Sequence, residues 1–249
     1  MFQQKNDYIM KKEFNLSPNF SKKLRNKKDI KFIVIHYTGM QSEIESLKRL
    51  KDPKSEVSCH YLINRKGQIK QMVTDSRIAW HAGKSKWKKF NNLNSNSIGI
   101  ELVNRGHEWG YQNYTKTQIK NLIKLCRNLK KKYKIKSQNF LGHSDIAPLR
   151  KVDPGQKFPW KKLSKFSLGV WYDNRIFKKK ENHEFTKKNS RMFFFKNLHK
   201  IGYRYFDIGK KSPKDKIIIR AFQQKFTPRK VDGSINLKIL QISRFLAKK

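Results

Sequence analysis

The chain has 249 residues, enough for one large domain or for a medium-sized domain beside a small one. Its 59 Lys and Arg against 18 Asp and Glu give a net charge of +41. That charge suits a polyanionic partner or a lysine-rich composition, and the spread of lysines along the whole chain favours composition. The two cysteines, Cys59 and Cys126, form no Cys-x-x-Cys pair, which argues against a disulfide framework or a thiolate metal site.

Membrane, export and nucleic-acid signals are weak in this sequence. No run approaches the roughly 20 apolar residues of a membrane helix. The N-terminal stretch "MFQQKNDYIMKKEFNLSPNF" lacks the apolar run of a signal peptide, which favours the cytoplasm, with the periplasm or cell envelope as the alternative. Charge alone would support a nucleic-acid-binding function, because the sequence contains no recognisable recognition helix or aromatic RNA-binding motif. We therefore expect no specific nucleic-acid partner.

The first half of the chain alternates apolar runs with a helical pattern. Residues 1–28 are polar and basic and predict an N-terminal tail. The apolar run 32–35 predicts a strand buried on both faces. Residues 42–50 predict a helix, because Ser42 and Glu45 have the spacing of a capping box and Ile44, Leu47 and Leu50 have helical spacing.

The pattern continues through the middle of the chain. Residues 57–73 predict a hairpin that turns at Lys66-Gly67, and 95–103 predict another buried strand. Residues 114–133 predict an amphipathic helix, capped by Thr115 and Gln118. Its buried stripe is Ile119, Leu122, Ile123, Cys126 and Leu129. With a short strand at 139–143, the pattern predicts an α/β domain over residues 29–172, a central mixed sheet flanked by helices.

The last third of the chain predicts a separate helical unit. Residues 173–188 are charged and polar and predict a linker. Residues 189–249 then predict a small helical domain, with short helices at 197–207 and 215–226, a turn at Asp232-Gly233 and a final helix.

Two histidines and one aspartate fall where α/β domains build their sites. His36 ends the most apolar strand, and His143 follows a short strand and a glycine. Asp153 lies in a Pro-Gly turn of the segment "GHSDIAPLRKVDPG". Two histidines and one carboxylate are a common ligand set of catalytic zinc. A histidine at a strand end is more often a hydrogen-bonded structural residue, so spacing alone leaves both interpretations open.

Glu101 is the most unusual carboxylate of the chain. It follows the apolar run Ile98-Gly99-Ile100, which places it at the end of a buried strand. A buried glutamate is rare unless it is paired or used, and burial raises its pKa enough for it to accept a proton near neutral pH. A salt bridge to one of the many lysines is the equal alternative.

Several segments together resemble one family. They are "FIVIHYTG", "VSCHYLINRKGQI", "AWHAGKS", "NSIGIELVN", "LGHSDIAPLRKVDPG" and "FPW". In this order, over residues 30–172, they resemble the type-2 N-acetylmuramoyl-L-alanine amidases, the zinc family that includes AmpD-like bacterial amidases, T7 lysozyme and the peptidoglycan recognition proteins. The segment 189–249, with "AFQQKF" and its "DG" turn, more loosely resembles a small helical peptidoglycan-binding domain.

The resemblance implies a function and roles for named residues. It implies one Zn²⁺ held by His36, His143 and Asp153, with Glu101 as the general base and Lys151 as the residue that stabilises the oxyanion. The bond hydrolysed would be the amide between the lactyl group of N-acetylmuramic acid and L-alanine of the stem peptide, in cell-wall turnover or anhydro-muropeptide recycling. The partner would be peptidoglycan or muropeptides.

Weaker expectations concern residues around these five. Trp80 and His81 match a block near the family's cleft and are candidates for substrate binding. Asp145 is a candidate for ordering its own loop or a ligand histidine. His60 is expected to be a packed structural residue, and both cysteines are expected in the core.

Two alternatives remain at the level of function. A non-catalytic peptidoglycan receptor could have the same fold, but all five residues of the implied machinery are present, which favours an enzyme. If residues 180–249 form a separate module, their removal should weaken binding to intact sacculi and spare a small muropeptide.

Overall fold

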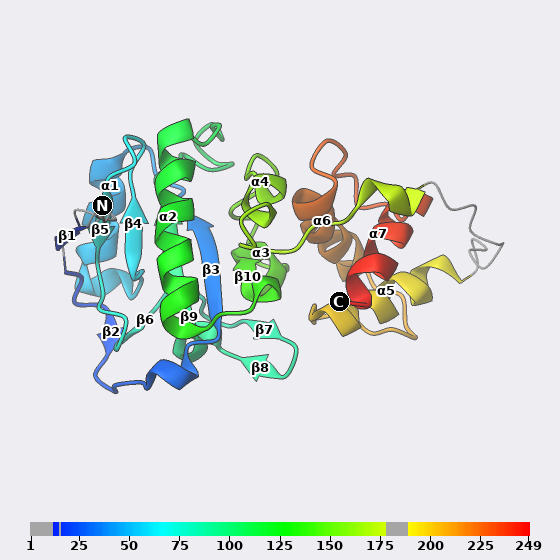
Figure 1. Cartoon of the computed structure of the whole chain (residues 1–249), viewed down its shortest axis with the longest axis horizontal. Coiled ribbons are helices and arrows are strands. Elements are labelled where there is room, and N and C mark those ends of the chain that lie inside the picture. The colour runs from blue at the N-terminus through cyan, green and yellow to red at the C-terminus, as the bar shows by residue number, and fades with distance from the viewer. Residues whose placement is uncertain (1–11, 15, 178–188) are drawn as a thin grey trace, which may run out of the picture.

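The computed structural model describes residues 12–14, 16–177 and 189–249 (Figure 1). Its main sheet has six strands in the order β1-β5-β4-β9-β3-β10. β4 and β5 are antiparallel, whereas the other neighbours are parallel. The predicted mixed α/β sheet is therefore confirmed. The strands are β1 Lys12–Phe14, β3 Phe32–Tyr37, β4 Tyr61–Ile63, β5 Ile69–Gln71, β9 Ser97–Leu102 and β10 Phe140–Gly142.

Short elements and helices complete the fold. Two small antiparallel pairs join β2 Phe20–Ser21 to β6 Ile78–Ala79 and β7 Lys86–Trp87 to β8 Phe90–Asn91. The α-helices are α1 Glu43–Lys51, α2 Lys116–Tyr133, α3 His143–Ile146, α4 Trp160–Ser164, α5 Ser190–Ile201, α6 Lys214–Phe226 and α7 Leu237–Ala247. The 3-10 turns are Lys27–Asp29, Pro53–Ser55, Leu93–Asn96, Ser137–Asn139 and Asn174–Phe177.

Strand β3, between β9 and β10, separates two hydrophobic cores. Ile33 and Ile35 belong to the core that includes the buried face of α2. Phe32 and Val34 belong to a second core, which the C-terminal helices share. Because side chains alternate along a strand, His36 points to the same face as Phe32 and Val34. The site therefore lies on the face of the sheet opposite α2.

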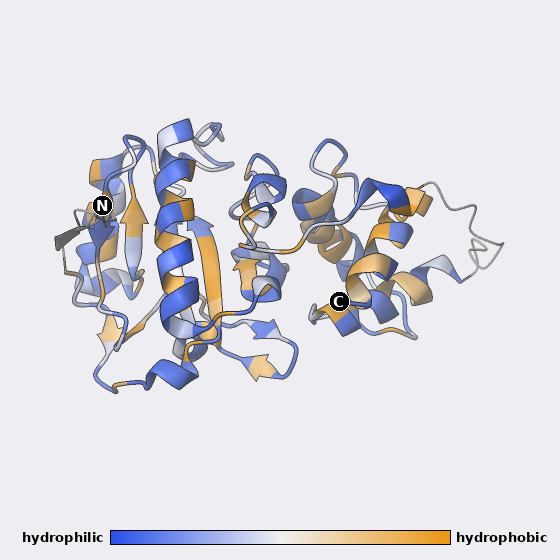
Figure 2. Ribbon diagram, viewed as in Figure 1, coloured by the Kyte–Doolittle hydropathy of each residue, from blue (hydrophilic) through white to orange (hydrophobic). Residues whose placement is uncertain are grey.

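Helix α2 follows its predicted pattern. Thr115 caps the helix and forms a capping box with Gln118, whose side chain also donates to the carbonyls of Ile63 and Val103. The five predicted stripe residues are buried. Figure 2 shows the outward side of α2 as hydrophilic, in contrast to the apolar β3 beside it. Local sequence signals therefore determine this layer.

Two predicted helices differ in detail from the structure. Ser42 caps α1 by accepting from the Glu45 amide, as predicted, but Ile44 is 75% exposed. The helix predicted at 197–207 begins earlier and ends before Gly202. Gly202 has φ 142°, and the Trp87 ring lies 2.5 Å from where a Cβ would stand. The close approach of β7 therefore ends α5 at this glycine.

The N-terminal segment expected as a tail packs against the domain wherever the structure describes it. Strand β1 pairs with β5, and β2 pairs with β6. Arg25 donates to the carbonyls of Asp75 and Ser97 and lies 2.6 Å from His60 Nε2. These partners are distant in sequence, so a polar and basic local composition could not reveal them.

The structure describes part of the expected linker and the whole of the expected C-terminal domain. Residues 178–188 of the predicted linker lie outside the described residues, and Asn174–Phe177 form a 3-10 turn. The predicted helix at 215–226 and the final helix are confirmed as α6 and α7. Leu141 and Ile146, next to the site, share one core with Phe194 and Phe222 of the C-terminal helices. Figure 1 shows these helices beside α3 and α4.

The helices of the described part of the chain are short or strongly polar. None of them is both long and apolar enough to cross a bilayer.

The shared core predicts that the sheet and the C-terminal helices unfold together. Phe222→Ala should destabilise the protein by about 3–5 kcal/mol, because the fully buried ring packs against Phe194 and Tyr203. Calorimetry should show one transition that moves as a whole. Ile217→Ala, 42% exposed on the same helix, is the control and should change stability by less than about 0.5 kcal/mol. Two separate transitions, of which only one responds, would contradict a shared core.

Candidate active site

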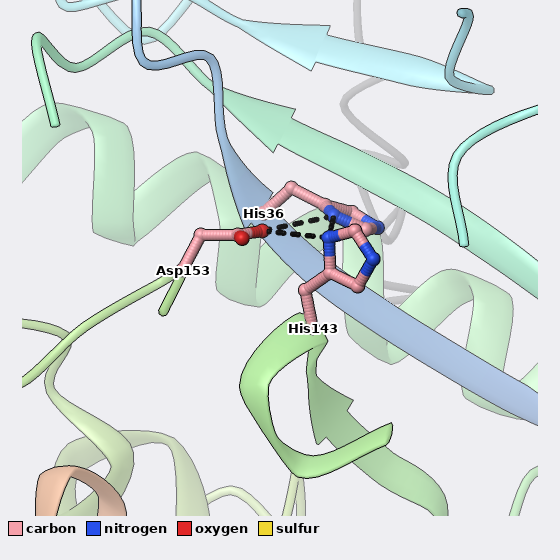
Figure 3. Close-up of side chains that lie close together, drawn as sticks. All are labelled: His36, His143 and Asp153. Carbon is pink, nitrogen blue, oxygen red and sulfur yellow. Dashed lines mark hydrogen bonds and ion pairs between the residues drawn. The ribbon is translucent and has the colours of Figure 1, made fainter. Parts of the chain in front are cut away.

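Three buried side chains converge where the parallel strands end. His36 lies near the end of β3, and His143 is the first residue of α3, directly after β10. Gly142 pairs with Ile35, so the next residues of both strands, His143 and His36, come to the same level. Nδ1 of His36 and Nδ1 of His143 are 3.0 Å apart, and Oδ2 of Asp153 lies 3.0 and 3.1 Å from them (Figure 3).

A chain of hydrogen bonds determines the tautomer of His36. Ser97 Oγ donates to the carbonyl of Leu93 at 2.6 Å, so it must accept from Nε2 of His81 at 3.1 Å. His81 then offers the lone pair of Nδ1, which accepts from Nε2 of His36 at 3.0 Å. The proton of neutral His36 is thus on Nε2, and its Nδ1 lone pair faces Asp153 and His143.

His143 is oriented in the same sense by different partners. Its Nε2 lies 3.2 Å from the carbonyl of Ala82, which can only accept, and 3.4 Å from Nη2 of Arg150, which can only donate. The shorter contact favours a proton on Nε2, which leaves the lone pair on Nδ1. Arg150 donates to the same carbonyl, and its Nε donates to the carbonyl of Lys84 at 3.0 Å. The sequence does not reveal this role of Arg150, because nothing near it in the chain indicates that it packs against residues 82–84.

Three acceptor atoms this close together require a positive charge between them. A proton on His36 is disfavoured as its source, because burial and the neighbouring His143 lower the pKa of His36 to about 4. In a four-coordinate zinc site with bonds of about 2.1 Å, ligand atoms lie roughly 3.4 Å apart. The observed separations of 3.0 to 3.1 Å are close to that value, and the two imidazole nitrogens and one carboxylate oxygen can hold a metal ion.

Glu101 lies beside His36 on the neighbouring strand. The two residues are register partners in the β3–β9 ladder, so their side chains project from the same face of the sheet. Glu101 is 8% exposed, and its Oε2 has no hydrogen-bond partner within the described part of the chain. Burial, together with the charge of Asp153, raises the pKa of Glu101 to about 8. An unpaired buried carboxylate is costly, and such groups occur at functional sites.

Lys151 lies in the loop between His143 and Asp153. Its backbone amide donates to the carbonyl of Ala147 at 3.1 Å, and its side chain is exposed. Its positive charge contributes to lowering the pKa of both Glu101 and His36, so it lies within electrostatic range of both residues.

The remaining candidates from the sequence have different surroundings. His81 is only 6% exposed, and its ring lies over Gly99, where a Cβ would stand 2.3 Å from His81 Cγ. It contacts His36 from behind, and its part in substrate binding remains a prediction. Trp80 is half-buried, and its role in substrate binding also stays a prediction. Asp145 accepts hydrogen bonds from the Gly142 amide at 2.7 Å, from Tyr203 and from Lys225, and none of these partners is His143.

The predicted structural residues are confirmed. His60 is fully buried and accepts from the Gly99 amide at 3.0 Å through Nδ1. Burial lowers the pKa of His60 to about 3, with a smaller contribution from the charge of Arg25. Cys59 and Cys126 are both buried free thiols.

An aromatic wall beside Asp153 has no counterpart among the expectations from sequence. His107 stacks on Tyr111 at 4.4 Å and hydrogen-bonds the Tyr37 hydroxyl at 2.8 Å. Tyr111 and Tyr114 both donate to the carbonyl of Pro154, at 2.6 and 2.7 Å. The signal that could have revealed it is "RGHEWGYQNY", a glycine- and aromatic-rich segment between a strand and a helix.

The fold and the site together define a class of protein. A mixed sheet carries, at the ends of its parallel strands, a buried His-His-Asp group that can hold a metal ion. A buried glutamate whose Oε2 has no partner in the described part of the chain stands next to it. These features are typical of hydrolases that use a bound metal ion and a carboxylate base.

Comparisons with known proteins identify the family within this class. The sequence profile of N-acetylmuramoyl-L-alanine amidases matches residues 26–156. The N-acetylmuramoyl-L-alanine amidase AmiD of Escherichia coli is 42% identical over 156 residues, which are 58% of this chain and 55% of AmiD. The 1,6-anhydro-N-acetylmuramyl-L-alanine amidase AmpD of Haemophilus influenzae is 37% identical over 164 residues, 59% of this chain and 86% of AmpD. The matched part thus spans about half of AmiD and most of AmpD.

Solved structures agree over a longer part of the chain. The E. coli AmiD complex with anhydro-N-acetylmuramic acid-L-Ala-D-γ-Glu-L-Lys has a TM-score of 0.77 at 32% identity, covering 88% of this chain and 89% of that one. AmpDh3 of Pseudomonas aeruginosa has a TM-score of 0.78 at 29% identity, covering 93% and 96%. The chain belongs to the N-acetylmuramoyl-L-alanine amidase family, and it is an enzyme of that family.

The raised pKa of Glu101 predicts a pH-dependent stability of the metal-free protein. A carboxyl group whose pKa is higher when folded contributes stability that is full below its unfolded value of 4.5 and is lost as pH rises through about 8. Glu101→Gln should remove this loss. Melting temperatures of both metal-free proteins between pH 4.5 and 9 should therefore diverge, with the variant more stable at the alkaline end. Parallel curves would contradict the buried, unpaired state of Glu101.

The hydrogen bond from His36 to His81 predicts an effect on metal affinity. His81→Ala removes the acceptor that orients His36, so Zn²⁺ affinity should fall about 10- to 100-fold. Competition with a chromogenic chelator measures this on the folded protein. His199→Ala, on the exposed side of α5, is the control and should bind Zn²⁺ as the wild type does. Equal affinities of all three proteins would exclude the orienting role of His81.

Proposed function

We propose that the protein is a zinc-dependent amidase that hydrolyses the bond between the lactyl group of N-acetylmuramic acid and L-alanine of the stem peptide. The observation that carries the proposal is the convergence of His36 Nδ1, His143 Nδ1 and Asp153 Oδ2 in a chain of the amidase family. The Nε2 atoms of both imidazoles already have protein partners, so these three lone pairs have no other use among the described residues.

The ligand set favours zinc over other cations. Two imidazoles and one carboxylate are a usual set for catalytic zinc, which keeps a fourth position for water or substrate. Magnesium and calcium prefer oxygen ligands alone. Bound there, zinc would polarise the scissile carbonyl and make a water acidic enough to lose its proton near neutral pH.

Glu101 would transfer the protons of the reaction. Its Oε2 has no partner among the described residues, and a pKa near 8 lets the carboxylate accept a proton and release it again at neutral pH. We assign it the proton of the attacking water, which it then delivers to the nitrogen of the leaving L-alanine. A nearby cation would lower the pKa of Glu101, which favours the ionised base.

Lys151 would stabilise the charge that develops on the carbonyl oxygen. It precedes Asp153 by two residues, and its charge acts on both His36 and Glu101. A positive group in such a position is typically worth about 3 kcal/mol in the transition state. Lys151 and a cation held by His36, His143 and Asp153 would then both stabilise this oxygen.

The substrate class follows from the structural relatives. AmiD was crystallised with anhydro-N-acetylmuramic acid-L-Ala-D-γ-Glu-L-Lys, and AmpDh3 with an anhydromuramic pentapeptide. We propose that this chain also acts on muramyl peptides. A cytoplasmic enzyme would meet soluble anhydro-muropeptides, whereas an envelope enzyme would meet the polymer. Rates on purified sacculi and on 1,6-anhydromuropeptides, together with cell fractionation, distinguish the two locations.

The C-terminal helices offer a second surface for the same material. A groove of about 780 Å³ is lined by Lys211 and Lys216 together with Phe195 and Ile219. Arg191 and Asp215 also line it, and they pair with each other. Cationic and apolar side chains together suit peptides that carry carboxylates. We propose that this groove binds stem peptides of peptidoglycan.

Removal of zinc and replacement of Glu101 test the proposed mechanism. A chelator should abolish hydrolysis, and added Zn²⁺ should restore it. Glu101→Gln should lower kcat by about 10²–10⁴ with zinc still bound, because only the proton transfer is lost. Release of L-alanine peptides, followed by chromatography, and zinc content by atomic absorption give the two readouts. Lys161→Met, an exposed surface lysine, is a control of unchanged activity. An active Glu101→Gln enzyme would refute the assignment of the base.

A further inference from the structure

The helix that begins with His143 is held by a buried carboxylate. Asp145 is 1% exposed, and its Oδ2 accepts from the Gly142 amide at 2.7 Å, at the start of α3. Helix α3 has only four residues, too few to be stable without support from outside. The position of the His143 imidazole therefore depends on what holds Asp145.

The partners of Asp145 come from the C-terminal part of the chain. Lys225 Nζ, on α6, lies 2.6 Å from Asp145 Oδ2, and the Tyr203 hydroxyl donates to Oδ1 at 2.5 Å. Lys225 also donates to the carbonyl of Phe140 in β10 at 3.3 Å and lies 4.1 Å from the ring centroid of Trp160. The lysine thus contacts the strand and the helix on either side of Gly142.

Neither charged group of the pair is freely accessible to water. Lys225 is 6% exposed, and Asp145 is less exposed still. A buried charge that loses its partner is strongly destabilised, so the two side chains hold each other in place. The pair is therefore a fixed link between α6 and α3, unlike a surface ion pair.

The same short helix is linked to the other ligand loop. The Ser144 amide donates to the carbonyl of Asp153 at 2.8 Å. A displacement of α3 would therefore move His143 directly and Asp153 through its backbone. Two of the three converging ligand atoms depend on the position that Lys225 and Tyr203 give to Asp145.

We propose that the C-terminal helices are a working part of the metal site, and that Lys225 and Tyr203 are positioning residues for His143 and Asp153. The proposal rests on the proposed function, in that these two residues are metal ligands. It replaces the expectation that residues 180–249 can be removed without effect on a small substrate. Loss of these helices impairs the site itself, whatever the size of the muropeptide.

The test measures Zn²⁺ affinity of the full chain, with zinc alone as the probe and a chromogenic chelator as competitor. Lys225→Met keeps most of the side-chain volume and removes the charge, and it should weaken Zn²⁺ binding about tenfold or more. Lys230→Met is the matched control, because Lys230 pairs with Asp232 on the surface of the same helical region, 3.5 Å apart. It should bind Zn²⁺ as the wild type does.

A second variant covers the case in which Lys225→Met does not fold. Tyr203→Phe removes one hydroxyl from a buried ring and should fold, with Zn²⁺ binding several-fold weaker than in the wild type. Circular dichroism well below the melting temperature establishes which variants are folded. If the variants that fold bind Zn²⁺ with an affinity within twofold of that of the wild type, the positioning role is overturned. A wild type that binds no Zn²⁺ would instead refute the proposed function.

Discussion

The parallel pairing of β10, β3 and β9 is the constraint on which the site depends. It places Gly142 beside Ile35 and His36 beside Glu101, so the next turn of chain after β10 begins at the level of the imidazole of His36. A shift of one residue in the β3–β9 ladder would turn Glu101 or His36 into the core under α2, and a shift in the β10–β3 ladder would displace His143. The register is held by the apolar residues of both faces, which form two separate cores. The positions of the site residues are thus determined by apolar packing several residues away from them.

Acidic residues are scarce in this chain, and several of them are used inside it. The buried ones are Asp75, Glu101, Asp145, Asp153 and Asp215. Each of the four aspartates has a charged, hydroxyl or imidazole partner on at least one carboxylate oxygen, such as Tyr61 for Asp75 and Arg191 for Asp215. Asp215 Oδ1 also lacks a partner, but Asp215 pairs with Arg191 through Oδ2. Glu101 differs, because its side chain has no such ion pair among the described residues, its buried Oε2 lacks a partner and its pKa is raised. That contrast within one molecule is the strongest physical reason to regard Glu101 as a reacting group.

Much of the fold could be predicted from local sequence, and the site only in part. The capping box of Thr115 and Gln118 and the apolar run of β3 are short-range signals, and both predictions are confirmed. His36, His143 and Asp153 could be proposed from strand ends and a Pro-Gly turn, but the family resemblance was needed to choose a metal site over structural histidines. Physical convergence of the three is visible only once the parallel strands are aligned.

The features that escaped prediction join residues far apart in the chain. Arg25 contacts His60, Arg150 contacts the carbonyl that His143 uses, and Lys225 contacts Asp145. In the sequence, these cations are indistinguishable from the dozens of solvated lysines and arginines around them. Burial separates them, and burial is a property of the tertiary fold.

The chain of hydrogen bonds from His36 through His81 and Ser97 ends on a backbone carbonyl of the fold itself. To bind a cation, the imidazole of His36 would then have neither to rotate nor to lose a proton. The orientation of His36 is set, through His81, by the packing around Gly99 and Leu93. In this respect the His-His-Asp group differs from the site of a zinc finger, whose ligands come together only when the ion binds.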